Sequence, residues 1–268
     1  MEDIDSLVRV AMTAARTAGD IQRQKYGSDL SVDQWLQYDL KLETDRLCEA
    51  AIINTIRSSF PTHAIYAEEG GRLDGSDYVW YVDPLDGTVN FYYGMPHFCT
   101  TLACYHLDDG AGDGSDLATL GTPRLGITYA PLLDEMFIAV AGHGAALNNR
   151  PLAVREEESL AESYLLAAIG SYPEKADFTR DFTFPLALRV RKMRAMGACA
   201  YDLASVAAGR SSGYFEYGVN TWDLAAGRLL VEEAGGCFTG KKLASGKWLF
   251  AASGKNIHPD LLGSIGLA

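Results

Sequence analysis

Residues 80–91 constrain this chain more than any other stretch, because two carboxylates stand in one turn directly after an apolar segment. The apolar residues that come first predict a buried strand. Asp83 and Asp86 flank Pro84 and precede Gly87, and these residue types favour a turn. Oxygen ligands at the end of a buried strand can hold a divalent cation. A plain turn would use the same residues, so the stretch alone leaves both interpretations open.

The local chemistry of this turn suits an anion as well as a cation. Asp83 precedes proline, so its backbone is driven to an extended conformation and it is expected to end the strand. The Leu85 carbonyl should then lie outside the regular ladder. Gly87 lets the backbone approach a ligand, and Thr88 is expected to cap a helix whose free N–H groups face a phosphate.

Further carboxylates occur at two other element ends. Glu68 and Glu69 follow a strand-like segment, and Asp223 begins a predicted helix. Each has a simpler explanation, surface charge for the glutamate pair and an N-cap for the aspartate. Taken together with the turn, they indicate a metal-dependent phosphatase. Two or three carboxylate-bound ions can activate water and neutralise the charge that develops during ester hydrolysis.

Charge and composition exclude several classes of protein. The net charge of −12 argues against a nucleic-acid-binding surface, although acidity that only keeps the protein soluble remains open. No apolar run approaches a membrane span, and the acidic start does not resemble a signal peptide. The five cysteines are odd in number and lack a Cys-x-x-Cys pair, which predicts buried free thiols and a cytoplasmic location.

Apolar periodicity predicts a layered arrangement of helices and strands rather than a regular βαβ repeat. Thr44 is the expected cap of the second helix, and residues 142–149 are expected to form a hairpin-like turn. Helices are predicted over 3–26, 44–58, 201–209 and 223–234, and strands over 64–67, 78–82, 98–105, 125–130, 135–141, 164–168, 214–216 and 248–252. The acidic stretch 108–116 lacks the glutamate of an EF-hand loop and is predicted to be a solvated connection.

The two longest motifs resemble a known family. Residues 80–91 look like the first signature of the inositol monophosphatase family, and residues 222–227, continuing through 233–236, look like the second. Supporting matches follow in family order along nearly the whole chain: Asp39-Leu40, Thr44-Asp45, Glu49, 67–69, Gly144-Ala145, Leu147-Asn148, Gly197-Ala198 and Glu216.

The resemblance implies an α+β fold, a layered α/β/α/β/α sandwich. The chain would form one domain over residues 1–268. About residues 1–150 would carry most metal ligands, and about residues 151–268 would complete the substrate pocket. A homodimer, a soluble phosphate ester as substrate, and inhibition by lithium are further implications of the resemblance.

The resemblance also implies roles for individual residues. Two or three Mg²⁺ ions, with Mn²⁺ as a possible substitute, would be held by Glu68, Asp83, the Leu85 carbonyl, Asp86 and Asp223. Glu68 and Thr88 would position the attacking water, Asp45 would help to polarise it, and Glu69 would support the metal shell. The substrate would meet Asp86, Gly87, Thr88, Gly197, Ala198, Glu216 and Asp223.

Departures from the family pattern affect the choice of substrate. Some members carry a lysine in the region of residues 33–38 and a histidine at the position of Asn220, and this chain has neither. The 108–123 insertion is long, and His97 and His143 are expected to be structural. Residues 89–91 and Glu216 favour myo-inositol 1-phosphate. The alternatives are fructose 1,6-bisphosphate, then 3′-phosphoadenosine 5′-phosphate or histidinol phosphate, and a regulatory protein-binding role that does not depend on catalysis.

Overall fold

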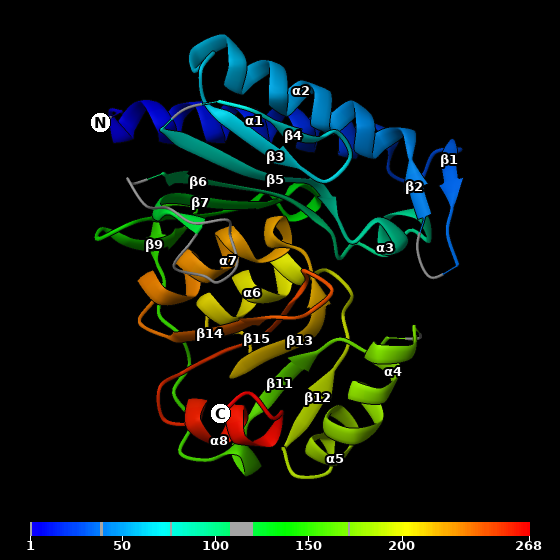
Figure 1. Cartoon of the computed structure of the whole chain (residues 1–268), viewed down its shortest axis with the longest axis vertical. Coiled ribbons are helices and arrows are strands. Elements are labelled where there is room, and N and C mark those ends of the chain that lie inside the picture. The colour runs from blue at the N-terminus through cyan, green and yellow to red at the C-terminus, as the bar shows by residue number, and fades with distance from the viewer. Residues whose placement is uncertain (1, 38–39, 76, 108–119, 171) are drawn as a thin grey trace.

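The computed structural model describes residues 2–37, 40–75, 77–107, 120–170 and 172–268. Its elements stack in five layers (Figure 1). Helices α1 (Ile4–Lys25) and α2 (Glu43–Ser59) cover one face of a large sheet. Helices α6 (Cys199–Ala207) and α7 (Thr221–Glu233) lie between that sheet and a smaller one. The predicted α/β/α/β/α sandwich is therefore confirmed.

The large sheet has eight strands in the order β10-β9-β8-β7-β6-β5-β3-β4, and only the β3–β5 pair is parallel within it. Its strands are β3 (Ala64–Ala67), β4 (Gly71–Leu73), β5 (Tyr78–Asp86), β6 (Cys99–His106), β7 (Thr122–Ala130), β8 (Glu135–Val140), β9 (Gly144–Leu147) and β10 (Arg150–Pro151). Parallel neighbours place their carboxyl ends at the same edge, and this brings the residues after β3 beside the end of β5.

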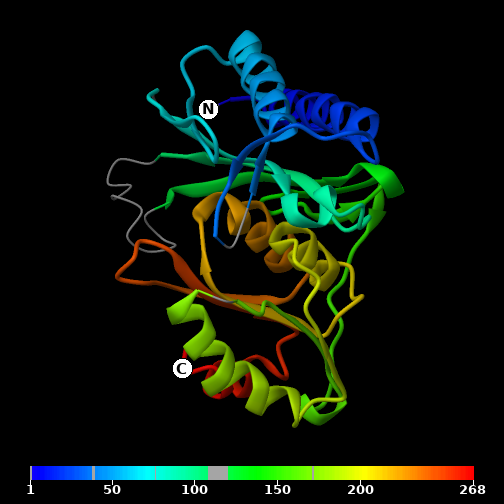
Figure 2. The same cartoon turned by 90° about the vertical axis from the view of Figure 1, so that its right-hand side faces the viewer.

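The smaller sheet has five strands in the order β12-β11-β13-β15-β14. These are β11 (Tyr164–Ala167), β12 (Lys192–Arg194), β13 (Gly213–Val219), β14 (Cys237–Lys242) and β15 (Trp248–Ser253). Its outer face is covered by α4 (Pro173–Phe178), α5 (Phe184–Ala187) and α8 (His258–Ser264). A separate two-stranded sheet pairs β1 (Val32–Trp35) with β2 (Leu40–Leu42), on the side of the molecule where the short helix α3 (Thr88–Tyr92) also lies (Figure 2).

Burial follows from this layering. In α1, Leu7, Ala11 and Ala18 are fully buried, and their spacing of four and seven residues gives one apolar stripe against the sheet. Every residue of α6 is buried, as expected for a helix held between two sheets. The five cysteines are free thiols, as predicted, and four of them are buried. Across the described ranges, no helix combines the length and the apolar character that crossing a membrane requires.

Several local predictions differ from the structure at element ends. Asp83 does not end its strand, because β5 pairs again at Asp86 with Cys99 after a register shift. Thr44 lies inside the first turn of α2 and the N-cap is Leu42, because the Asp45 carboxylate accepts the Leu42 N–H at 2.7 Å.

The other differences have similar causes. Thr88 is the first residue of α3, and Gly87 is its N-cap in the left-handed conformation. Asp223 is the third residue of α7, where it accepts the N–H of the N-cap Asn220 at 2.7 Å. Residues 142–149 contain strand β9 as well as turns, because this segment pairs with β8. The predicted connection over 108–116 lies outside the described residues, as does most of the 108–123 insertion.

Candidate active site

Near its end, β5 leaves the regular ladder between Asp83 and Asp86 and forms an irregular turn. The Leu85 N–H donates to Asp83 Oδ1 at 3.0 Å, which closes the turn on its own carboxylate. Gln22 of α1 donates through Nε2 to the Pro84 carbonyl at 2.8 Å. The Leu85 carbonyl accepts the Thr88 hydroxyl at 2.9 Å. Since none of these carbonyls is used in the ladder, the Leu85 oxygen keeps a second lone pair for a ligand.

Glu68 comes beside Asp83 because β3 and β5 are parallel. Ala67 lies opposite Val82 in register, and the Glu68 N–H donates to the Val82 carbonyl at 3.2 Å. The next residue, Glu69, donates its N–H to Glu49 Oε2 on α2 at 2.8 Å. The two strand ends that the sequence predicted separately therefore form one edge.

Asp45 and Thr88 are also brought together, from helices 43 residues apart in sequence. Thr88 Oγ1 lies 3.1 Å from Asp45 Oδ1 and donates to it, while Asp45 Oδ2 accepts the Leu42 N–H. Asp45 is almost fully buried. The Asp45 carboxylate therefore orients the Thr88 hydroxyl, and the lone pairs of the Thr88 oxygen point away from Asp45.

Asp86 is held by the N-terminus of α6. Its Oδ1 accepts the Cys199 N–H at 3.0 Å, and its Oδ2 accepts those of Ala200 and Tyr201 at 2.8 and 3.3 Å. An anionic side chain at a helix N-terminus is stabilised by the free N–H groups and the helix dipole. The contact joins the two halves of the sequence at this edge.

The following turn docks onto the segment that precedes α6. Gly87 has φ +88°, and a Cβ there would lie 2.9 Å from the His97 carbonyl, so a larger residue would clash. Asn90 donates through Nδ2 to the carbonyls of His97 and Met196, both at 2.8 Å. Gly197 and Ala198 are therefore placed next to Gly87 by the Asn90 amide.

Asp223 and Glu216 complete the group from the second half of the chain. Glu216 is buried on β13, and Asp223 is partly buried in the first turn of α7. Burial, followed by the charge of Glu68, raises the pKa of Asp223 well above its usual range, and the charges of Asp86 and Glu216 add to this effect. Charges couple in this way only over short distances, so the two halves converge on one region.

The other carboxylates show the same mutual repulsion. Burial, and then the charges of Glu68, Asp86 and Asp223, holds the pKa of Asp83 well above its usual range. Burial is also the main cause that raises the pKa of Asp86 to about 7 and that of Asp45 to about 7. A cluster of buried carboxylates is stable in its charged form only when cations compensate it.

The donor set fits hard divalent cations, since it consists of carboxylate and carbonyl oxygens. Within the described ranges, no three acidic, histidine or cysteine side chains already stand in metal-ligand geometry. The carboxylates are held instead by donors of the chain itself, and Asp86 Oδ1 and the Leu85 carbonyl each accept one hydrogen bond, which leaves each with capacity for a cation.

One cation that sequence reasoning missed lies within this cluster. Lys41 Nζ donates to Glu68 Oε1 at 2.6 Å and to Glu69 Oε1 at 2.5 Å. The family pattern places a lysine before the position of Asp39, and here the ammonium comes from strand β2, two residues after it. A signal was present: Lys41 alternates with the buried Leu40 and Leu42, so it faces the opposite side of the strand.

Two further partnerships were also missed. His97, expected to be structural, lies with Nε2 2.9 Å from Asp202 Oδ1 at the start of α6. Lys175 of α4 donates to Glu216 Oε1, and the Tyr214 hydroxyl donates to Glu216 Oε2. No short-range pattern connects His97 with Asp202 or Lys175 with Glu216, because the members of these two pairs are 105 and 41 residues apart.

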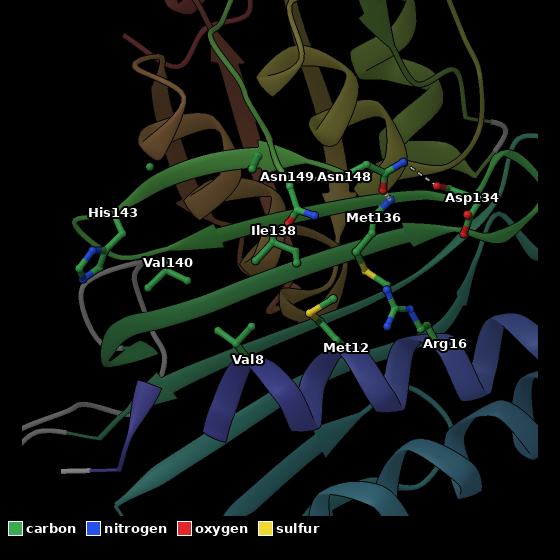
Figure 3. A pocket seen from close by; sticks show the side chains of 12 residues that line it. Val8, Met12, Arg16, Asp134, Met136, Ile138, Val140, His143, Asn148 and Asn149 are labelled. Carbon is green, nitrogen blue, oxygen red and sulfur yellow. Dashed lines mark hydrogen bonds between the residues drawn. The ribbon is translucent and has the colours of Figure 1, made fainter. Parts of the chain in front are cut away.

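A separate pocket of about 600 Å³ lies between α1 and the strands β8 and β9 (Figure 3). Val8 and Met12 of α1 face Met136 and Ile138 of β8 across it. None of the predicted site residues lines this pocket, so it is distinct from the carboxylate cluster.

Comparison with known proteins gives consistent findings. The family model described as "Inositol monophosphatase family" matches residues 3–263. The protein named Nus factor SuhB of Pasteurella multocida is 37% identical over 87% of this chain and 84% of its own length. Inositol monophosphatase 2 of Solanum lycopersicum is 34% identical over 87% and 86%. The crystal structure of extragenic suppressor protein suhB from Bartonella henselae superposes with a TM-score of 0.87, at 30% identity over 97% and 98% of the two chains.

Proposed function

Since the chain belongs to the inositol monophosphatase family and is a metal-dependent phosphatase, we propose that it hydrolyses a small polyol or sugar phosphate monoester, with myo-inositol 1-phosphate as the first candidate. The observation that carries this proposal is the convergence of Glu68 after β3, Asp83 and Asp86 of β5, and Asp223 of α7, from both halves of the chain. The proposal also treats residues 1–268 as one domain, completed by its second half.

We propose that Glu68, Asp83, the Leu85 carbonyl, Asp86 and Asp223 hold two or three Mg²⁺ ions, with Mn²⁺ as a substitute. Such ions, when bound, polarise the phosphoryl group and supply a nucleophilic water. The chain holds the carboxylates in place before any ion binds. The Leu85 N–H fixes one oxygen of Asp83, and the N-terminus of α6 fixes Asp86 and leaves Oδ1 able to bind a cation.

Glu68 and Thr88 are proposed to position the attacking water. The one hydroxyl proton of Thr88 is shared between the Leu85 carbonyl and Asp45 Oδ1, so the lone pairs of Thr88 Oγ1 can accept a hydrogen bond from water. Asp45 thus acts through Thr88. Glu69 supports Glu68 from the next position, where its backbone is fixed by Glu49.

The substrate is proposed to bind across the two halves of the chain. The N–H groups of Gly87 and Thr88 would hold the phosphate at the start of α3. Asp86, Asp223, Glu216 and the backbone at Gly197 and Ala198 would hold the alcohol part. Asn90 supports this arrangement, because its amide fixes the Gly197 segment against the turn. Carboxylates on the alcohol side accept hydrogen bonds from hydroxyl groups, as a polyol requires.

The remaining family features are carried here as proposals. They are a homodimer, inhibition by lithium and a cytoplasmic location. The free cysteines support the last of these, since thiols persist where the surroundings are reducing.

Phosphate release from a substrate panel tests the proposed activity. We expect Mg²⁺-dependent turnover of myo-inositol 1-phosphate above that of fructose 1,6-bisphosphate, 3′-phosphoadenosine 5′-phosphate and histidinol phosphate. Chelation should abolish the signal, and added Mg²⁺ should restore it. A folded protein that releases no phosphate from any of the four compounds would contradict the proposal.

A regulatory protein-binding role is the second candidate, and one observation favours it. The relative that is 37% identical carries the name Nus factor, whereas the relative named inositol monophosphatase 2 is 34% identical. An Asp86→Asn variant expressed in cells distinguishes the phosphatase role from the regulatory protein-binding role. Retention of the cellular effect would favour binding, and its loss would favour catalysis.

Lys41 gives a further test of the cluster. In Lys41→Met, Glu68 and Glu69 lose their ammonium partner, so the chelated protein at pH 8 should melt about 2–5 °C lower, a figure reduced for partial exposure. The apparent Mg²⁺ affinity should rise, because the ammonium no longer competes for the same oxygens. Thermal melts with and without chelator measure the first effect, and Mg²⁺ titration measures the second.

Lys25→Met is the matched control, since Lys25 pairs with Glu43 at 3.2 Å on a more exposed surface. We expect a small change in its melting temperature and none in its Mg²⁺ affinity. Equal effects in the two variants would show that Lys41 has no special relation to the cluster.

A further inference from the structure

Gln22 is a polar side chain in the otherwise apolar buried stripe of α1. The other buried residues of this helix are Leu7, Ala11, Ala14, Ala15, Ala18 and Gly19. Gln22 is fully buried as well, although it lies only three residues before the end of α1 at Lys25. Burial of an amide costs free energy unless its donors and acceptors are paired. An apolar side chain would continue the stripe without this cost, so the glutamine is explained only if its amide has a role.

The Gln22 amide is paired on one side only. Its Nε2 donates to the Pro84 carbonyl at 2.8 Å, whereas Oε1 has no hydrogen-bond partner among the described residues. The orientation of the amide follows from this partner, because a carbonyl oxygen can only accept and must therefore face the NH₂ group. The unpaired oxygen destabilises the folded chain. Within the part of the chain that the structure describes, the bond to Pro84 is the contact that offsets this destabilisation.

The Pro84 carbonyl and the Leu85 N–H belong to one peptide unit. This unit is trans, so its C=O and its N–H point in opposite directions from one plane. Gln22 holds the carbonyl, and on the other side the Leu85 N–H donates to Asp83 Oδ1 at 3.0 Å. Because the plane is rigid, the bond to Gln22 sets the direction of the N–H and thereby the position of the Asp83 carboxylate.

The peptide unit lies where the sheet does not hold it. Regular pairing of β5 with β6 is interrupted between Asp83 and Asp86, so the backbone groups of this segment need other partners. A hydrogen bond to the carbonyl also polarises the unit and makes its N–H a stronger donor. Asp83 is buried and is repelled by the neighbouring carboxylates of the cluster. A fixed donor opposes the tendency of its side chain to turn away from them.

We propose that Gln22 is a positioning residue for metal binding, which holds the Asp83 carboxylate in its ligand orientation through the Pro84–Leu85 peptide unit. In this role Gln22 contacts neither the ion nor the substrate and acts through Asp83. Residues that orient metal ligands in this way typically change metal affinity by about 10–100-fold. The inference rests on the proposed phosphatase function and adds a residue of α1 to its metal site.

Gln22→Met tests this role, because methionine has a similar length and no N–H donor. We expect the dissociation constant for Mg²⁺, measured by calorimetry, to rise by about tenfold or more. The melting temperature of the chelated protein should change by less than about 5 °C, since loss of the bond and removal of the unpaired oxygen act in opposite directions. Phosphatase activity should fall at limiting Mg²⁺ and recover when Mg²⁺ is raised. A residue that only stabilises the fold would not show this recovery.

Leu7→Ala is the control, because Leu7 is fully buried on the same helix and lies about 22 Å from Gln22 along its axis. The cavity should lower the melting temperature by about 4–20 °C and leave the Mg²⁺ affinity within about twofold of the wild type. Gln22→Leu repeats the test with a shorter apolar side chain. An unchanged Mg²⁺ affinity in the Gln22 variants, or an equal loss of affinity in Leu7→Ala, would overturn the proposal.

The Gln22→Met exchange in an Asp83→Asn background shows whether Gln22 acts through Asp83. We expect less than about a twofold further change in Mg²⁺ affinity, because the carboxylate that Gln22 positions is already absent. A further loss as large as in the wild-type background would show that Gln22 acts by another route, and the proposal would be wrong. These measurements report Mg²⁺ binding. They therefore decide the role of Gln22 even if no phosphate ester is hydrolysed, in which case the phosphatase proposal fails separately.

Discussion

Replacement of Asp83 by asparagine is expected to abolish phosphatase activity while stabilising the metal-free protein. Asp83 is fully buried, and its charge is opposed by those of Glu68, Asp86 and Asp223. Asparagine keeps an oxygen that can accept the Leu85 N–H, so the turn should survive. The change removes one anionic metal ligand, and we expect kcat/KM to fall by about a thousandfold or more.

A loss of activity together with a gain in metal-free stability distinguishes a residue that binds the metal from one that only holds the fold. Chelated Asp83→Asn should melt at or above the temperature of the chelated wild type at pH 8, since three neighbouring carboxylates lose a repelling partner. Calorimetry should show weaker Mg²⁺ binding. A variant that melts well below the wild type would mean that Asp83 holds the fold, and retained Mg²⁺ binding would contradict its role as a ligand.

Asp202→Asn provides a control from the same neighbourhood. Asp202 is as buried as Asp83, but its carboxylate lies against His97 Nε2 at 2.9 Å. Its replacement should leave the Mg²⁺ binding isotherm unchanged and lower activity far less than Asp83→Asn. The comparison separates the loss of any buried carboxylate from the loss of a carboxylate in the cluster.

The stability of the chelated protein is expected to fall as the pH rises from about 4 to about 7, and Mg²⁺ should reverse this fall. Burial raises the pKa of Asp45 and of Asp86 to about 7, from the ordinary aspartate value of 3.8. The folded state therefore binds more protons than the unfolded state in that interval. The free energy of unfolding decreases with rising pH wherever the folded state binds more protons than the unfolded state. Asp45 and Asp86 therefore favour folding at low pH and oppose it above pH 7.

Two histidines act in the opposite direction. Burial lowers the pKa of His63 and of His258, so each favours folding as the pH rises toward its unfolded value. An Asp45→Asn variant isolates the carboxylate contribution, because it keeps both histidines. We expect its chelated form to lose less melting temperature than the wild type between pH 5.5 and pH 8.

Thermal melts with chelator and with Mg²⁺ at the two pH values measure the effect. At pH 8, Mg²⁺ at about one hundred times its dissociation constant should add about 2.7 kcal/mol, or about 5–10 °C. At pH 5.5 the shift should be smaller, because protons compete with the ion for the carboxylates. A Mg²⁺ shift that does not depend on pH would contradict the buried cluster as the binding site.

Much of the candidate site could be predicted from the sequence, because its central part is local. Asp83, Leu85, Asp86, Gly87 and Thr88 lie in one turn, and residue type together with a preceding apolar run predicts where such a turn falls. Glu68 could be added because strand ends gather at the edge of a sheet. The exact strand end was wrong, since renewed pairing of Asp86 with Cys99 depends on a neighbouring strand.

The partners of these residues were decided by tertiary structure alone. The amides that hold Asp86 come from residues 113 to 115 positions further along the chain. Lys41 reaches Glu68 across 27 residues, and Lys175 reaches Glu216 across 41. The sequence by itself determined which carboxylates stand at element ends and so the chemistry available to them. Packing of the two sheets around α6 and α7 decided which charges meet, because such contacts depend on where whole layers lie and leave no periodic trace along the chain.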